Sequence, residues 1–389
     1  MRIAFYAPLK SPTHSVPSGD RRVARLLIDA LERAGHQVEL AASLRTFDSE
    51  GNVARQAGLR DEGERLAQDL VARWGGDPGR RPDLWFTYHV YYKAPDWLGP
   101  RVAAEFGIPY VIAEASYAPK RADGPWAIGH AAAERAIRSA ALVLCPTQYD
   151  MGCIAPLVAS PERVVSLPPF LDAGPYRAAA QERERHRARL SVAHGLDPAV
   201  PWIVVAAMMR PRDKLDSYSM LARVLRQVTD IPWQVVVAGD GTARNEVEAA
   251  FEGAASGRAR FLGECAAERL AEIYAACDLC VWPAVNEAYG MAMLEAQAAG
   301  VPVVSRAVRG VPDVVCDGRT GLLAPAGDEE ALSGLVRELL LDAPRRSGMG
   351  RAAARFVADE RSIDAAAGIL NRALGAIPSG EPSPQAARR

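Results

Sequence analysis

Apolar runs alternate with helix-like segments along the first half of the chain. Residues 21–35 show helical periodicity and end at Gly35, a common type of helix stop. Short runs that are apolar throughout are typical of parallel strands buried on both faces of a sheet. The predicted strands are residues 3–7, 37–42, 84–90, 110–115, 141–147 and 163–168. The pattern predicts an α/β domain whose parallel sheet is covered by helices.

The same alternation restarts near residue 202. The predicted strands of this second series are residues 202–208, 233–241, 259–264, 279–284, 301–305 and 321–326. Helical stretches separate these runs, and a chain of 389 residues is too long for one ordinary core. We predict two similar Rossmann-like, doubly wound domains that face one another across an interdomain cleft.

Composition indicates where the domains meet. Residues 181–201 are rich in charge and close with a Pro-containing turn, which is typical of a crossing between domains. We expect an N-terminal domain over residues 1–185 and a C-terminal domain over 186–360. A helix over 362–377 is expected to pack back on the N-terminal domain. The polar, Pro/Ser-rich tail over 378–389 is expected to be disordered.

Bulk composition narrows the class of protein. Hydrophobic residues make up 49% and charged residues 24% of the chain, which is typical of a soluble globular protein. The net charge of -1 gives no basic excess for nucleic acid, so a small-molecule partner is expected. The chain has no apolar run of transmembrane length, and its N-terminus resembles a buried strand rather than a signal peptide. We expect a cytoplasmic protein, with peripheral contact at the inner face of the membrane left open.

Two short motifs resemble metal- or cofactor-binding sequences but are incomplete. The sequence CDLC at 277–280 has the spacing of a metal or redox pair, yet no second pair exists, so buried apolar cysteines are expected. The sequence AGDGTAR at 238–244 places Gly239 and Gly241 after a strand but lacks the third glycine of a dinucleotide fingerprint. A tight turn that lets a ligand approach is the preferred interpretation. We expect neither a metal nor a cofactor.

Two glutamates stand seven residues apart in NEAYGMAMLEAQAAG, residues 286–300. A helix is predicted between Gly290 and Gly300. Glu295 then lies within it among alanines, and Glu287 lies in the loop before it. That loop is where open α/β sheets bind ligands, outside the carboxyl ends of their strands. A pair of solvated glutamates is the alternative.

Two cations are predicted at the same edge of the second sheet. Arg210 and Lys214 follow its first strand, so they are expected near Glu287. They would converge on a diphosphate beside the helix N-terminus at Gly290 and Met291, whose free N–H groups favour anions. Carboxylates for sugar hydroxyls and cations for phosphates together predict a nucleotide-sugar site. A solvated basic loop is the alternative.

With these motifs the chain resembles glycosyltransferase family 4, the retaining GT-B enzymes, up to about residue 360. The family's signature of two glutamates falls on Glu287 and Glu295. Its G-x-P-V strand falls on residues 300–303, and its D-G-x-T-G-x-L turn on residues 317–323. Two further segments, PERVVSLPPFLD at 161–172 and PSGDRRV at 17–23, also resemble the family.

The resemblance implies a hexosyltransferase-like enzyme of glycan, glycolipid or glycoconjugate biosynthesis. It would move a sugar from a nucleotide diphosphate to an acceptor hydroxyl with the anomeric configuration retained. Glu295 would bind the ribose and Glu287 the donor sugar, while Arg210 and Lys214 would stabilise the leaving diphosphate. The other donor-binding candidates are Gly239, Gly241, Gly290 and Met291. No Asp-any-Asp triplet occurs in the chain, so a metal clamp is not expected.

The first domain is expected to hold the acceptor. The candidate acceptor-binding residues are Gly19, Asp20, His89, Glu114 and Lys120. Glu114 stands near the place where the family often has a histidine. In the donor loop, Met-Met-Arg-Pro-Arg replaces the family's usual Gly-Arg, which leaves Arg210 or Arg212 as the partner of Lys214. For His89, Glu114 and Lys120 a purely structural role is the alternative.

Three alternative functions remain, of which a nucleotide-sugar epimerase can use the same architecture. A nucleotide-sugar epimerase needs no acceptor site, and a non-catalytic nucleotide-sugar-binding protein would show affinity without turnover. An oxidoreductase is disfavoured by the missing third glycine. The sequence names neither the sugar, the base nor the acceptor, and lipid-linked, polysaccharide and small-molecule acceptors all remain open.

Overall fold

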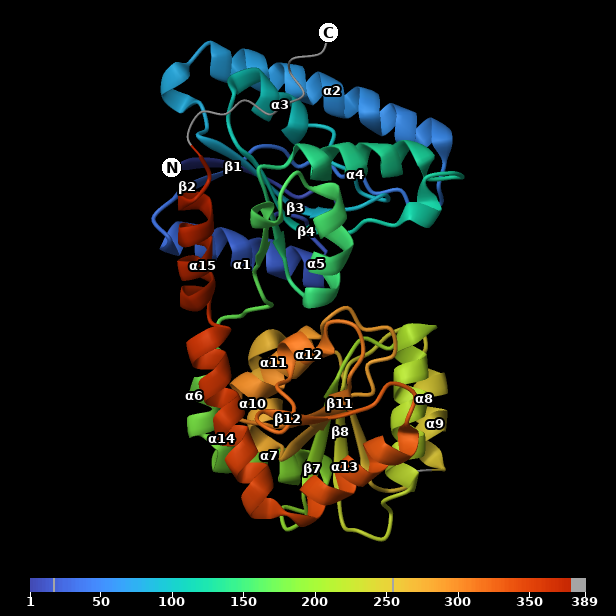
Figure 1. The fold of residues 1–389 in the computed structure, drawn as a ribbon. Coiled ribbons are helices and arrows are strands. Elements are labelled where there is room, and N and C mark those ends of the chain that lie inside the picture. Colours follow the sequence, from blue (N-terminus) through green and yellow to red (C-terminus); the bar gives the residue numbers. More distant parts are fainter. Residues whose placement is uncertain (17, 254, 379–389) are drawn as a thin grey trace. The chain divides into compact units, whose positions relative to one another are not determined.

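The computed structural model divides the chain into two compact domains. It describes residues 1–16, 18–253 and 255–378. The N-terminal domain comprises Met1–Pro168 together with the C-terminal segment that begins at Ile363, and the C-terminal domain comprises Pro169–Ser362. Each domain is built on its own six-stranded sheet (Figure 1). Among the described residues, no helix combines the length and the apolar character needed to cross a membrane.

The sheet of the N-terminal domain has the strand order β2-β1-β3-β4-β5-β6, and all neighbouring strands are parallel. Its strands are β1 (Arg2–Tyr6), β2 (Gln37–Leu40), β3 (Leu84–Val90), β4 (Tyr110–Ala115), β5 (Leu142–Cys145) and β6 (Val164–Ser166). The chain adds β2 on one side of β1 and all later strands on the other. The point between β1 and β3 is therefore a topological switch point, where such sheets bind ligands.

Helices connect these strands and cover the sheet. They are α1 (Gly19–Arg33), α2 (Val53–Gly75), α3 (Gly99–Phe106), α4 (Ala127–Ser139) and α5 (Gln148–Ile154), with the 3-10 turns η1 (Pro78–Arg80), η2 (Pro119–Arg121), η3 (Ala155–Leu157) and η4 (Pro161–Arg163). Ser18 caps α1 by accepting a hydrogen bond from the backbone N–H of Arg21. The fully buried Trp74 of α2 packs edge-on against Trp85 of β3, which anchors this long helix to the core.

The sheet of the C-terminal domain has the order β12-β11-β10-β7-β8-β9, again with all neighbours parallel. Its strands are β7 (Trp202–Ala206), β8 (Gln234–Ala238), β9 (Ala259–Gly263), β10 (Leu279–Val281), β11 (Val303–Arg306) and β12 (Gly321–Ala324). Strands β8 and β9 are added on one side of β7, and β10 to β12 on the other. The switch point of this domain lies between β7 and β10.

Most helices of the C-terminal domain connect consecutive strands of its sheet. They are α6 (Gly174–Gln181), α7 (Arg183–His194), α8 (Asp213–Arg226), α9 (Arg244–Glu252), α10 (Ala267–Ala276), α11 (Met291–Ala298), α12 (Val311–Val314), α13 (Glu329–Leu341) and α14 (Ala343–Glu360). Every strand run predicted from the sequence forms a strand of these two sheets, within a few residues at each end. The doubly wound α/β class is thereby confirmed.

The domain limits differ from those expected. Residues 181–201 are not a crossing between domains, because α7 packs within the C-terminal domain against α10. Two of its charged residues, Arg183 and Arg187, both form ion pairs with Asp278, the residue before β10. Leu190 supplies a fully buried apolar contact on the same helix. The boundary therefore falls after Pro168 rather than after residue 185.

The last helix, α15 (Ile363–Gly375), belongs to the N-terminal domain. It packs against α1, and Arg33 of α1 forms an exposed ion pair of 2.7 Å with Asp364. The buried face of α15 includes Ile363, Leu370 and Leu374. Residues 379–389, which make up nearly all of the tail expected to be disordered, lie outside the described residues.

Cysteines 277 and 280 are part of the core. Cys277 is fully buried and Cys280 nearly so, at 0% and 3% exposure, and both thiols are free. Burial raises the pKa of the Cys280 thiol to about 12. Both side chains therefore act as small apolar groups, as the sequence predicted.

Candidate functional site

The predicted donor residues lie at the switch point of the C-terminal domain. Lys214 belongs to the first turn of α8, which follows β7, and Glu287 belongs to the loop that follows β10. Strands β7 and β10 are direct neighbours in the sheet. Two segments more than seventy residues apart in sequence are thus brought to one point by strand order.

Glu287 is the centre of a compact polar cluster. Lys214 forms an ion pair with its Oε2 atom, and the indole Nε1 of Trp282 donates a hydrogen bond of 3.1 Å to the same oxygen. The Nζ atom of Lys214 also lies 5.3 Å from the centroid of the Trp282 ring. The side chain of Glu287 is 17% exposed and that of Lys214 is 32% exposed. Both therefore remain accessible to a small molecule while being held in one orientation.

The loop that carries Glu287 is fixed to the start of α8. Its backbone N–H at Val285 donates a hydrogen bond of 2.9 Å to Ser217 Oγ, and the amide of Asn286 donates one of 2.9 Å to Asp213. Asn286 has a φ of 52°, a left-handed conformation that is less costly for asparagine than for most residues. Arg309 donates a hydrogen bond of 2.6 Å to the Asn286 side chain from the next loop of the sheet. Glu287 is therefore positioned by contacts on both sides of its loop.

Strand β11 supports the same loop from below. Ser305 donates a hydrogen bond of 2.7 Å to the carbonyl of Trp282, and Arg306 donates one of 2.7 Å to the carbonyl of Pro283. Arg306 is only 7% exposed, and burial lowers the pKa of its guanidinium. These positioning residues were not predicted from the sequence. The available signal was a serine and an arginine at the end of an otherwise apolar strand.

Glu295 lies in a different environment from Glu287. It is a residue of α11 and only 5% exposed, beside the fully buried Tyr274 of α10. Burial and then the charge of Glu295 raise the pKa of Tyr274 well above its usual value. The structure thus separates the two glutamates into a partly exposed carboxylate in a loop and a buried one in a helix.

The helix of Glu295 begins as predicted, at Gly290 and Met291. Gly290 has a φ of 78°, and a side chain at this position would clash with Met293 and approach Glu287. Arg210, the other predicted phosphate ligand, is exposed in the loop between β7 and α8. Within the described part of the chain, its side chain forms no ion pair.

Gly239 and Gly241 have a structural reason to be glycine. A Cβ atom on Gly239 would lie 2.0 Å from the carbonyl oxygen of Ala207, and one on Gly241 would lie 2.2 Å from that of Met209. Backbone hydrogen bonds join the two loops, including one of 2.9 Å from Met209 N–H to the Asp240 carbonyl. The close approach that the sequence suggested is made by the neighbouring loop of the same domain. Their proposed role in donor binding rests on position alone.

The N-terminal domain brings three of its predicted residues together at its own switch point. Nδ1 of His89 lies 3.2 Å from Oδ1 of Asp20 and 3.5 Å from Oε1 of Glu114. His89 is the last residue but one of β3, and Asp20 lies in the first turn of α1, the helix that follows β1; β1 and β3 flank the switch point. His89 and Glu114 both have positive φ values, 64° and 61°, which are uncommon for residues with side chains. The cluster therefore combines strained backbone with three titratable groups.

The other two acceptor candidates take no part in this cluster. Gly19 is the first residue of α1, so it lies in a helix turn rather than in a loop. A side chain at this position would meet no neighbour, so no close approach requires glycine here. Lys120 is exposed in η2 and forms no hydrogen bond or ion pair with the described residues. The geometry therefore favours Asp20, His89 and Glu114 over Gly19 and Lys120.

The pKa of His89 predicts a pH dependence of stability. Burial lowers it, but the carboxylates of Glu114 and Asp20 outweigh burial and raise it above its usual value. A raised folded pKa means that protonated His89 stabilises the folded chain fully below about pH 6.5, and that this contribution is lost as the pH rises through the folded pKa. Denaturant unfolding measured between pH 5 and pH 9 (about the range where histidine titrates) should show this loss. His89→Gln should flatten the profile and the control His14→Gln should not; equal profiles for all three proteins would contradict the expectation.

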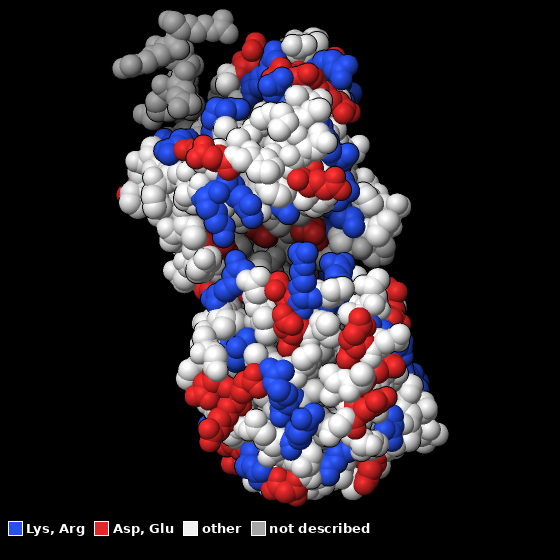
Figure 2. All heavy atoms as spheres, turned by 90° about the vertical axis from the view of Figure 1, so that its right-hand side faces the viewer, with Lys and Arg blue, Asp and Glu red and all other residues white. Residues whose placement is uncertain are grey.

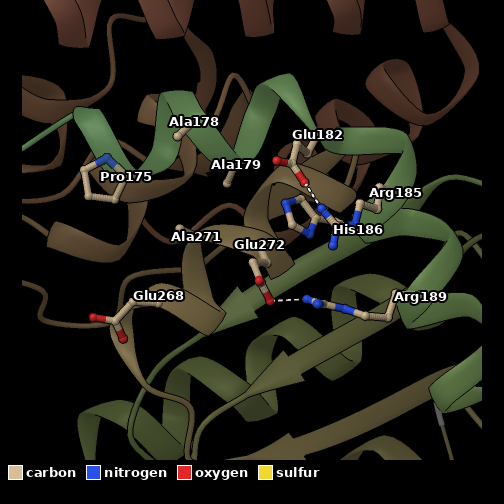
Figure 3. A pocket seen from close by; sticks show the side chains of 10 residues that line it. All are labelled: Pro175, Ala178, Ala179, Glu182, Arg185, His186, Arg189, Glu268, Ala271 and Glu272. Atoms are coloured by element: carbon tan, nitrogen blue, oxygen red, sulfur yellow. Dashed lines mark hydrogen bonds and ion pairs between the residues drawn. The ribbon is translucent and has the colours of Figure 1, made fainter.

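A cavity of about 280 Å³ lies elsewhere in the C-terminal domain, among α6, α7 and α10 (Figure 3). Its charged lining is largely paired internally, because Glu182 binds Arg185 and Glu272 binds Arg189. None of its lining residues comes from the loops at the switch point. Figure 2 shows basic and acidic side chains interspersed on the face in view of each domain, without a broad basic area of the kind that binds nucleic acid.

Comparison with known proteins shows which proteins this chain resembles in sequence and in fold. Residues 201–342 match the family model described as glycosyl transferases group 1. The D-inositol 3-phosphate glycosyltransferase of Corynebacterium aurimucosum is 31% identical over 221 residues, which cover 54% of this chain and 51% of that protein. The same enzyme of Stackebrandtia nassauensis is 43% identical over 93 residues, 24% of this chain and 21% of that protein. The chain thus matches about half or less of the length of these curated relatives.

Solved structures resemble the whole chain. Sucrose-phosphate synthase from Thermosynechococcus elongatus has a TM-score of 0.69 at 21% identity, over 97% of this chain and all of that one. The Anabaena protein HepE in complex with UDP-glucose has a TM-score of 0.68 at 18% identity, over 96% and 99% of the two chains. Two Rossmann-like domains of this kind define a GT-B glycosyltransferase fold. The family model matches the part of the chain that carries the motifs by which it resembles glycosyltransferase family 4.

Proposed function

We propose that the protein is a retaining glycosyltransferase that moves a sugar from a nucleotide-diphosphate donor to an acceptor hydroxyl. The observation that carries the proposal is the pairing of Glu287 with Lys214 at the switch point of the C-terminal domain. A carboxylate and an ammonium group held side by side offer an acceptor for sugar hydroxyls next to a cation for phosphate. The relatives named D-inositol 3-phosphate glycosyltransferase and the UDP-glucose complex of HepE support sugar transfer from a nucleotide-sugar donor.

Each residue of the C-terminal site takes a distinct role in this proposal. Glu287 accepts hydrogen bonds from donor-sugar hydroxyls, and Lys214 with Arg210 stabilises the charge that builds on the leaving diphosphate. Glu295 binds the ribose hydroxyls. In the N-terminal domain, His89 with Asp20 and Glu114 supplies the polar groups that bind the acceptor hydroxyl and orient it for transfer. Neither glutamate acts as a covalent nucleophile.

Turnover is expected to survive removal of divalent metals. The cations that the proposal assigns to the diphosphate are Lys214 and Arg210, and no cluster of metal-ligating side chains occurs within the described residues. Initial rates should therefore change by less than about twofold in EDTA, because protein cations supply the electrostatic stabilisation. A loss of turnover that magnesium or manganese restores would show that the assignment of the diphosphate site is wrong.

The function is tested by a panel of nucleotide sugars. Thermal unfolding is measured with each candidate donor, because a ligand at a hundred times its dissociation constant stabilises the folded state by about 2.7 kcal/mol. The stabilising donor is then incubated with candidate acceptors, and release of the nucleoside diphosphate and the anomeric configuration of the product are followed. Conversion of the donor without any acceptor would indicate an epimerase. Stabilisation without turnover across the acceptors would indicate a binding protein.

A further inference from the structure

Two cations and two aromatic rings form a second cluster in the N-terminal domain. Tyr92 and Lys93 follow β3, Arg121 ends η2 and Trp126 precedes α4. Nζ of Lys93 and Cζ of Arg121 each lie 5.0 Å from the centroid of the Trp126 ring. They lie 5.9 Å and 5.5 Å from the centroid of Tyr92. All four side chains are partly exposed, so the cluster is open to a ligand.

No carboxylate of the described residues neutralises the positive charge of this cluster. Across the described residues, neither Lys93 nor Arg121 has a carboxylate partner, although both cations share the same pair of rings. Nε of Arg121 is buried and has no hydrogen-bond partner among those residues. Like charges held close together repel, and a buried donor that stays unpaired is costly. An anion bound by both side chains relieves the repulsion between the two cations.

The backbone around the cluster is held rigidly. The backbone N–H of Asp48 donates a hydrogen bond of 2.8 Å to the carbonyl of Lys93. The indole of Trp126 donates one of 3.2 Å to the carbonyl of Asp48, and Gln56 donates one of 3.0 Å to the Asp48 carboxylate. Asp48 is 2% exposed and Gln56 is 4% exposed. A buried network therefore ties the segment of Lys93 to the segment of Trp126.

A second set of contacts fixes the aromatic rings. Gln56 also donates a hydrogen bond of 2.7 Å to the carbonyl of Pro125 and accepts one of 3.0 Å from the N–H of Gly129. A Cβ atom on Gly129 would lie 2.2 Å from the carbonyl oxygen of Tyr92, so only glycine allows this approach. The rings of Tyr92 and Trp126 meet edge to face at 5.7 Å. Such support is typical of a preorganised binding site rather than of a freely moving surface.

The cluster is continuous with the acceptor site assigned above. The ring of Tyr91 lies 5.1 Å from His89 and 5.5 Å from Tyr92. A ligand bound at Lys93 and Arg121 is thus one aromatic residue away from His89. We propose that Lys93 and Arg121, mounted on Tyr92 and Trp126, bind a phosphate group of the acceptor, an inference that rests on the proposed function for naming the ligand as acceptor.

Phosphate fits these two side chains better than a neutral group. A guanidinium presents several N–H donors in one plane and an ammonium adds a compact charge, which together suit the oxygens of a phosphate monoester. The aromatic faces beside them suit the C–H surface of a sugar or cyclitol ring. The acceptor class that follows is a phosphorylated polyol or sugar, either as a small molecule or as a lipid headgroup.

The test is binding of inorganic phosphate to the full-length protein, measured by calorimetry with the donor site saturated by the nucleoside diphosphate found in the donor panel. The Lys93→Gln, Arg121→Gln double variant should weaken this binding by about tenfold or more, since each charged hydrogen bond contributes at least that much. The double variant Arg101→Gln, Arg135→Gln removes the same charge from exposed positions on α3 and α4 and should leave binding unchanged. Equal phosphate binding by all three proteins overturns the inference.

Transfer assays separate this inference from the proposed function. Glucose and glucose 6-phosphate are offered as a matched pair of acceptors. Phosphatidylcholine vesicles that contain either phosphatidylinositol or phosphatidylinositol 4-phosphate test a lipid source, because both headgroups carry free hydroxyls and only the second carries a phosphate monoester. Preference for either phosphorylated partner, lost in the Lys93 and Arg121 variant, supports the inference and identifies the source. If the wild-type protein and the variant transfer sugar to unphosphorylated acceptors at the same rate and show no preference for the phosphorylated ones, the inference is overturned. The proposed glycosyltransferase function is then unaffected. Phosphate binding that needs both cations, in a protein that transfers no sugar, keeps the anion site and overturns the proposed function.

Discussion

Glu287→Gln is expected to lower kcat by about 10²- to 10³-fold, the loss typical of removing one preorganised electrostatic group from an active site. The substitution keeps the size of the side chain but removes its charge. Glu287 now forms an ion pair with Lys214 and accepts a hydrogen bond from Trp282, so the loss of charge also releases the ammonium group that is proposed to stabilise the leaving diphosphate. Both effects grow as charge develops in the transition state, so KM should change little.

A control variant and a double variant make this result interpretable. Glu246→Gln removes an exposed carboxylate from α9 of the same domain and should keep wild-type kinetics. Lys214→Gln should reduce kcat as Glu287→Gln does. If the pair acts as one unit, the combined variant should lose much less than the product of the two single losses. Wild-type kcat in Glu287→Gln would mean that the carboxylate is a solvated surface group.

The fold was predictable because its signals are local. Each strand is a short apolar run, and Gly290 and Gly300 mark the ends of α11 within the sequence itself. The domain boundary was not predictable in this way. The charge of residues 181–201 suggested a solvated crossing. Only the structure shows that Arg183 and Arg187 form ion pairs with Asp278, about ninety residues later. A pairing across such a distance leaves no periodic signal in the sequence.

The candidate site likewise combines features that the sequence predicts with features that only the structure shows. The sequence pointed to Glu287, Lys214 and Arg210 because they follow strands that share one edge of a sheet. It did not reveal that Glu287 and Lys214 pair directly, or that Ser305 and Arg306 hold the loop from β11. Those facts depend on strand order, which places β11 beside β10. In the other domain, a different strand order places β3 beside β1 and so brings His89 to Asp20.

Glu295→Ala is expected to raise the KM for the donor by about tenfold to a hundredfold, with kcat within about threefold of wild type. Glu295 is proposed to bind the ribose, a part of the donor that does not change during transfer. Hydrogen bonds of equal strength in the ground and transition states alter binding and leave the rate of the bound complex unchanged. Steady-state kinetics with varied donor, compared with Glu246→Ala, measure the split.

Because Glu295 is buried, the folding stability of its variants must be measured together with their kinetics. At 5% exposure beside Tyr274, the carboxylate is held in the core of the domain, where a charge is normally costly to keep. Replacing it with alanine removes that cost and leaves a small void, so the two effects on the free energy of unfolding oppose each other. Glu295→Gln keeps the volume and should share the rise in KM, because an amide replaces one acceptor oxygen with a donor group. A cooperative melt near the wild-type temperature, together with a raised KM in both variants, is the expected result. If both variants instead unfold early while the remaining folded protein binds donor normally, Glu295 is a structural residue and the ribose is bound elsewhere.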